Sequence, residues 1–226
     1  MEDQQIEFQN TLQPGIDLLN TRVAEIKKEI GKVVVGQETI IDLLLAGIFT
    51  GGHILLEGVP GIAKTLTAKL VARAVSVRFS RIQFTPDLMP TDVTGTTVFN
   101  LKTSEFTFNK GPVFANIVLI DEINRAPAKT QSSLFEVMEE KQISIDGNTY
   151  PMDFPFLVIA TQNPIEQEGT YRLPEAQLDR FLFRLKLGYP SLDQEVEILK
   201  KFRNDFSAKV FEQVRPVISK HASARH

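Results

Sequence analysis

The sequence contains no cysteine and only three histidines among its 226 residues. Without cysteine the chain can form neither disulfides nor thiolate zinc sites, and it has no thiol nucleophile. Two of the histidines, His221 and His226, lie within the last six residues, which leaves little for a histidine metal cluster. The chemistry must therefore come from other residue types.

The sequence also lacks a large excess of charge of one sign, and it lacks long apolar runs. The 25 basic and 28 acidic side chains leave a net charge of −3, which argues against a protein held to nucleic acid mainly by charge. No apolar run approaches the roughly 18 residues of a membrane span, and the longest, residues 43–49, contains Gly47. The start of the chain is acidic and amide-rich, so we expect no secretion signal, no transmembrane segment and a cytoplasmic location.

What remains is typical of a globular domain with alternating strands and helices. Short apolar runs predict five strands, which helix-like stretches mostly separate, and this alternation favours a parallel sheet. The predicted strands are residues 53–57, 81–84, 116–121, 156–161 and 181–187. An amphipathic helix is predicted ahead of them, closed by Gly31, from apolar residues spaced by three and four between Leu12 and Ile30.

Two further pairs of short runs predict β-hairpins inserted into this framework. The first joins residues 96–99 to 105–108, and the second joins residues 142–145 to 148–150. Asp146-Gly147 lies between the second pair and suits a turn with positive φ. We therefore predict an α/β fold with a five-stranded parallel sheet, flanking helices and two hairpin inserts.

Residues 58–65 read GVPGIAKT, directly after a predicted strand and directly before a helix pattern. Backbone N–H groups in such a turn converge on an anion, and the helix N-terminus adds partial positive charge. Lys64 is predicted to reach the β- and γ-phosphates of a nucleotide, and Thr65 to offer its hydroxyl to Mg²⁺. The predicted nucleotide-binding residues are Gly58, Val59, Pro60, Gly61, Ile62, Ala63, Lys64, Thr65 and Leu66.

One position departs from the phosphate-loop motif. Ala63 stands where a second glycine is expected, so the interpretation requires that residue to adopt helical dihedrals. The alternative is a strand-to-helix turn that binds no ligand.

Two carboxylates follow the apolar run at residues 117–120. Ligands gather at the carboxyl edge of an open α/β sheet, so Asp121 is predicted to hold Mg²⁺ and Glu122 to polarise an attacking water. The alternative is that Asp121 and Glu122 are ordinary polar residues at the end of a strand and bind no ligand. After the next predicted strand, the Asn163 amide could orient that water or contact the γ-phosphate, although Asn before Pro is also a routine turn starter.

Taken together, these residues resemble the MoxR family of AAA+ ATPases. The resemblance covers residues 33–190 and is highly specific. It rests on VVVGQE at 33–38, GVPGIAKT, IQFTPDLMPTDVTGT at 82–96, GPVFANIVLIDEINRAPAKTQ at 111–131, MEEKQISIDG, and ATQNPIEQEGTYRLPEAQLDRF at 160–181. It implies a nucleotide-binding core over 33–190, preceded by the helix in 1–32 and followed by a helical tail in 191–226.

The resemblance also implies roles for single residues. Asn163 would be the first sensor, and Arg180 the arginine finger of a neighbouring subunit, although an arginine at a helix end is usually a cap or salt-bridge partner. A finger acting in trans requires head-to-tail contacts that close into a ring, which in this family is a hexamer. Arg125 is a weaker candidate for a subunit-contact or site role. The adenine pocket would be formed by Val35, Gly36 and Gln37.

The implied activity is Mg-ATP hydrolysis coupled to chaperone-like remodelling or maturation of client proteins, with von Willebrand A domain proteins as partners and no nucleic acid. Two features depart from the family pattern: Arg172 stands where proline is commoner, and the tail in 191–226 is only the start of a truncated or missing helical lid. A nucleic-acid-dependent motor and a nucleotide-gated interaction module with little hydrolysis remain as alternatives. The hairpins would face the ring pore or a partner, or would simply extend the sheet.

Overall fold

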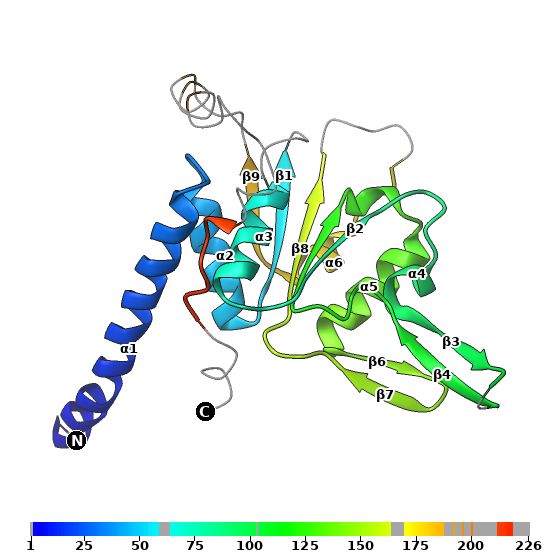
Figure 1. The fold of residues 1–226 in the computed structure, drawn as a ribbon, viewed down its shortest axis with the longest axis horizontal. Coiled ribbons are helices and arrows are strands. Elements are labelled where there is room, and N and C mark those ends of the chain that lie inside the picture. Colours follow the sequence, from blue (N-terminus) through cyan, green and yellow to red (C-terminus); the bar gives the residue numbers. More distant parts are fainter. Residues whose placement is uncertain are drawn as a thin grey trace.

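The computed structural model describes residues 2–58, 64–102, 104–163, 170–187 and 212–218, with 192, 196 and 200 as single positions, and only the backbone of 2–12 and 187. Five strands form one parallel sheet in the order β2-β5-β8-β1-β9 (Figure 1). They are β1 (His53–Gly58), β2 (Phe79–Gln83), β5 (Ile117–Asp121), β8 (Leu157–Gln162) and β9 (Phe181–Leu187). The predicted five-stranded parallel sheet is thus confirmed, with strand limits shifted by at most two residues.

The three central strands are apolar on both faces because helices cover the sheet on both sides. One face carries Ile54, Ile117 and Ile159, which pack against α1 (Glu2–Gly31), α2 (Glu38–Thr50) and α3 (Lys64–Ala74). Residues 212–218 join this layer, where Arg73 Nε donates to the Val214 carbonyl at 2.7 Å. Among the described residues, no helix is both long and apolar enough to cross a bilayer.

The opposite face packs against α5 (Ala128–Glu140), with the shorter η1 (Ile123–Arg125), α4 (Pro90–Thr94) and α6 (Glu175–Leu178) around it. Leu134, Val137 and Met138 of α5 are buried there, as their helical spacing predicts. Helices α2 and α4 were not predicted: α2 is apolar on most of its circumference, and α4 spans only five residues. The first helix begins at Glu2, whereas the apolar pattern begins only at Leu12. The difference arises because the first turns of the helix lack an apolar stripe. The helix predicted after Ser191 lies almost entirely outside the described residues.

The two predicted hairpins are present and form one arm, which extends from the body at the lower right of Figure 1. The first pairs β3 (Gly95–Asn100) with β4 (Glu105–Lys110), and the second pairs β6 (Gln142–Ile145) with β7 (Asn148–Pro151). The rings of Phe108 and Tyr150 lie 4.4 Å apart, and Thr97 Oγ1 donates to Asp146 Oδ2 at 2.7 Å. Because neither hairpin pairs with the main sheet, neither extends it.

The segments that lead from this arm into the sheet are tied to each other by Asn116. Its Nδ2 donates to the carbonyls of Asp153 and Pro155, at 3.2 and 3.0 Å. Its own carbonyl accepts from the N–H of Leu157 at 2.8 Å. The entrance to β5 and the entrance to β8 are therefore held together.

His53 lies at the amino end of β1 and is 4% exposed. Its Nδ1 accepts a hydrogen bond from the Val158 N–H at 3.0 Å, and its Nε2–H donates to the Met138 carbonyl at 3.1 Å. Burial lowers the pKa of His53, and the charge of Lys141 lowers it further, against the opposing hydrogen bond to Met138. The neutral ring therefore connects β1, β8 and α5.

This arrangement predicts a loss of stability in mild acid. The pKa of His53 is lower in the folded than in the unfolded chain, so protons bind preferentially to the unfolded chain. The contribution is fully present above the unfolded pKa of about 6.5 and declines below it, by at most about 1.4 kcal/mol on reaching pH 5.5. Urea unfolding at pH 7.5 and 5.5 should show a steeper loss in the wild type than in His53→Gln. Equal losses in the two proteins would contradict this role.

Candidate functional site

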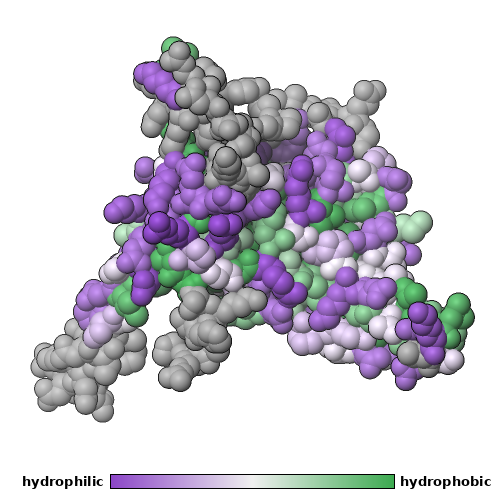
Figure 2. All heavy atoms as spheres, in the orientation of Figure 1, coloured by the Kyte–Doolittle hydropathy of each residue, from purple (hydrophilic) through white to green (hydrophobic). Residues whose placement is uncertain are grey.

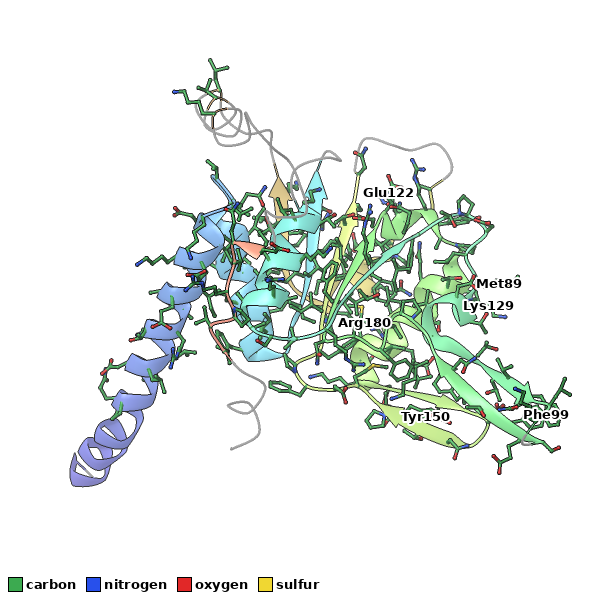
Figure 3. All side chains as sticks on the ribbon, viewed as in Figure 1. Met89, Phe99, Glu122, Lys129, Tyr150 and Arg180 are labelled. Atoms are coloured by element: carbon green, nitrogen blue, oxygen red, sulfur yellow. The ribbon has the colours of Figure 1, made fainter. Side chains whose placement is uncertain are left out.

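All five strands are parallel, so their carboxyl ends lie along one edge of the sheet, at the top of the view in Figure 1. The register pairs Gln83 with Asp121 and Glu57 with Gln162 at this edge. Figure 3 shows Glu122 at the same edge. Asp121 and Glu122, both nominated by the sequence, therefore lie at this edge.

Four of the predicted phosphate-loop residues are described: Gly58 ends β1, and Lys64, Thr65 and Leu66 begin α3. Val59, Pro60, Gly61, Ile62 and Ala63 lie outside the described residues. Lys64 is 9% exposed, and its Nζ donates to the Gly58 carbonyl at 3.4 Å. The lysine side chain thus reaches from the first turn of α3 to the end of β1.

The electrostatic surroundings of Lys64 link it to the acidic strand end. Burial lowers the pKa of Lys64, because a charged ammonium is poorly solvated there, and the Asp121 carboxylate opposes this shift. The charges of Lys64, in α3, and Asp121, at the end of β5, therefore favour each other, although β8 separates β5 from β1. A buried cation near the end of β1 offers a place for an anionic ligand.

Asp121 is held by side chains from both neighbouring strands. Its Oδ2 pairs with Arg81 Nε of β2 at 2.6 Å, and its Oδ1 accepts from Thr161 Oγ1 of β8 at 3.3 Å. Thr161 in turn accepts from the Glu122 N–H at 3.1 Å. Sequence reasoning missed Arg81 and Thr161, since their approach to Asp121 depends on a strand order that no local motif encodes.

Glu122 has left-handed backbone dihedrals, φ 56° and ψ 52°, which are uncommon for a residue with a side chain. Such backbone outliers cluster at functional sites. Its Oε2 accepts from Gln83 Nε2 at 2.8 Å and pairs with Arg125 Nε at 3.2 Å. The structure thus places Arg125 beside Glu122, and adds Gln83, which the sequence reasoning did not nominate.

The remaining candidates on this side lie around α3 and the end of β8. Asn163 directly follows β8 and is half-buried. Gln37 precedes α2 and is buried, and its Oε1 accepts from Thr67 Oγ1 of α3 at 2.5 Å. Gly36 has a φ of 71°, and Val35 is half-buried. Gln37 is therefore anchored to α3, the helix that follows the phosphate loop.

Among the predicted catalytic residues, all of which the structure describes, Arg180 lies away from this edge. Its Nε and Nη2 both donate to Glu139 Oε2, at 3.0 and 2.5 Å, and its Nη1 donates to the Ala176 carbonyl at 3.2 Å. In Figure 3 it lies beside α5, well below Glu122. Within a single chain, Arg180 does not join the cluster formed by Lys64, Asp121 and Glu122.

Comparison with known proteins identifies a family, two relatives and a solved structure that this chain resembles. Residues 53–183 match the ATPase family associated with various cellular activities (AAA). The chain is 57% identical over 171 residues to Chaperone MoxR1 of Mycobacterium tuberculosis, covering 76% of this chain and 45% of that protein. It is 48% identical over 202 residues to uncharacterized protein YeaC of Bacillus subtilis, covering 89% and 62%. A crystal structure from Cytophaga hutchinsonii has a TM-score of 0.83 at 50% identity, over 96% of this chain and 64% of that one. The chain spans less than two thirds of each relative's length.

Proposed function

Because the chain belongs to the AAA family of ATPases and, within it, to the MoxR group, we propose that it binds Mg-ATP at the carboxyl edge of its sheet and hydrolyses it. The observation that carries this proposal is that Lys64, which begins α3 and bonds to the end of β1, lies at the same sheet edge as Asp121 and Glu122 at the end of β5. Lys64 would supply a cation for the phosphates, Asp121 a carboxylate that binds a metal, and Glu122 a carboxylate that polarises water.

The residues present suit Mg²⁺. This ion is usually bound by one or two carboxylates together with substrate phosphates and water, rather than by a cage of protein ligands. Asp121 offers a carboxylate whose Oδ1 has one long hydrogen bond, and the hydroxyl of Thr65 lies at the start of α3. We therefore assign Mg²⁺ to Asp121 and Thr65. When bound, the ion would neutralise charge that develops on the phosphates.

The other residues would position the reactants. Lys64 would contact the β- and γ-phosphates, and Glu122 would orient and polarise the attacking water. Asn163 would contact the γ-phosphate from the end of β8. In this proposal the adenine lies against residues 35–37, of which Gln37 is anchored to α3.

The proposal extends to assembly and clients. A finger role for Arg180 requires a head-to-tail ring, in which Arg180 of one protomer enters the site of the next, and we propose a hexamer. The hairpin arm exposes apolar side chains far from the nucleotide site, seen at the lower right of Figure 2 and near Phe99 in Figure 3. These side chains are Val98, Phe99, Leu101 and Phe106. We propose that the arm contacts protein clients that the ATPase remodels, with von Willebrand A domain proteins as partners.

One observation favours a second candidate function. The Glu122 carboxylate is already engaged by Gln83 and Arg125, so a form of the protein that keeps these bonds would bind ATP without activating water. Such a protein would act as a nucleotide-gated interaction module. Phosphate release at high protein concentration separates this module from the ATPase.

Nucleotide binding is tested by Lys64→Ala. Loss of one charged hydrogen-bond donor to the phosphates should weaken ATP binding by about 10- to 150-fold. The affinity is measured by titrating a fluorescent ATP analogue. The matched control is Lys69→Ala, which removes an exposed cation from the same helix and should leave the affinity unchanged. If both variants bind ATP like the wild type, the phosphate site is wrongly placed.

A further inference from the structure

A buried carboxylate lies directly before the phosphate loop and is used by none of the roles above. Glu57 is the last residue of β1 before Gly58 and is 3% exposed. Its Oε1 pairs with Arg184 Nη2 of β9 at 2.7 Å and also accepts a hydrogen bond from Gln162 Nε2 of β8. One oxygen atom therefore links the ends of β1 and β8 to the middle of β9.

Stability alone gives little reason for this arrangement. Removing an ion pair from water costs free energy, and well-packed apolar side chains often stabilise a protein as well or better. The remainder of β1 follows the apolar pattern, with Ile54, Leu55 and Leu56 all buried. In β1 the charged side chain, that of Glu57, stands directly before the phosphate loop.

The location of Glu57 links it to Asn163. Glu57 and Gln162 are direct partners in the parallel register, and each is followed by a predicted site residue, Gly58 in one strand and Asn163 in the other. The bond between them joins the last residue pair in the register of β1 and β8. It sets how far the start of the phosphate loop lies from Asn163.

The end of β8 is held from both faces of the sheet. Thr161 contacts Asp121 on the face that α3 covers, where Ile159 also packs. Gln162 contacts Glu57 on the other face, which carries Ala160. Two successive side chains are thus bonded on opposite faces of the sheet directly before Asn163.

We propose that Glu57 is a positioning residue that acts through Gln162 to hold Asn163 at the γ-phosphate. This inference rests on the proposed nucleotide site and deepens it, because it assigns the discrimination between ATP and ADP to a side chain that touches neither. Arg184 pairs with the buried carboxylate and fixes its orientation.

The test measures the ratio of ATP to ADP affinity together with kcat. Glu57→Met removes the acceptor and should lower both the ratio and kcat about tenfold, the loss of roughly one hydrogen bond to a charged phosphate, while ADP affinity stays within about twofold. Glu57→Gln retains an acceptor oxygen and should recover most of the loss. Gln162→Met, which breaks the same link from β8, should reproduce Glu57→Met, and it decides the question if Glu57→Met does not fold.

A double-mutant cycle and a stability control complete the experiment. If Glu57 acts through Asn163, Glu57→Met should add less than about twofold to the loss caused by Asn163→Ala. Ile54→Val loosens the core of the same strand and should leave the ATP-to-ADP ratio unchanged. Fully additive losses, equal weakening of ATP and ADP, or an unchanged ratio in Gln162→Met would overturn the proposal. A wild type that binds neither nucleotide would instead refute the proposed function, and the inference with it.

Discussion

Replacing Glu122 with glutamine is expected to lower ATP turnover by about 10²- to 10⁴-fold, the usual contribution of a positioned general base. The amide has the shape of the carboxylate and can still accept from Gln83, but it cannot polarise a water by negative charge. ATP affinity should remain within about threefold of the wild type, because Lys64 and Asp121 are unchanged.

The measurement is steady-state phosphate release alongside a direct binding titration. Glu136→Gln is the matched control, since it removes an exposed carboxylate from α5 and should keep full turnover. Normal turnover in Glu122→Gln would refute the assigned role. If the wild type releases phosphate no faster than Glu122→Gln at high protein concentration, the interaction module becomes the better function.

Replacing Arg180 with alanine is expected to lower turnover by about 10³-fold or more, the range for arginine fingers. The variant should still bind ATP, because Arg180 is bonded to Glu139 and Ala176 and does not reach the strand ends of its own chain. In a ring, the loss would fall on the neighbouring protomer's site. Arg78→Ala, which removes an exposed arginine paired with Asp153, is the control and should retain activity.

A mixing experiment separates a finger in trans from a role within one chain. Glu122→Gln protomers keep Arg180, and Arg180→Ala protomers keep Glu122, so a mixed ring contains some complete sites. Equal mixing of the two inactive proteins should therefore restore turnover well above either protein alone. A mixture that stays inactive while rings form would show that Arg180 does not act across a subunit boundary.

The parts of the fold and site that could be predicted from the sequence are those encoded locally. The apolar runs are sufficient to predict the strands. Asp146-Gly147 is sufficient to predict its turn, where both residues adopt positive φ. Lys64, Asp121 and Glu122 were predicted because a loop motif and a strand end each carry their own chemistry in adjacent residues. The positions of these three at one edge agree with that prediction, while their roles stay predictions.

The parts that could not be predicted depend on which strands become neighbours. Arg81 and Thr161 reach Asp121 only because β2 and β8 flank β5, and Glu57 meets Arg184 only because β9 lies beside β1. Nothing in a stretch of apolar residues specifies that order. The packing of Phe108 on Tyr150 was missed for the same reason, since it joins hairpins that are separate in sequence.

The joined hairpins have a mechanical consequence. Strand β4 continues into β5, which ends at Asp121, and β7 continues into β8, which ends beside Asn163. Asn116 fastens the two connecting segments to each other at the base of the arm. A force applied at the exposed tip is therefore transmitted to both strands together. In the same way, a displacement of either strand end is transmitted to the tip, so the arm and the two strands are mechanically coupled.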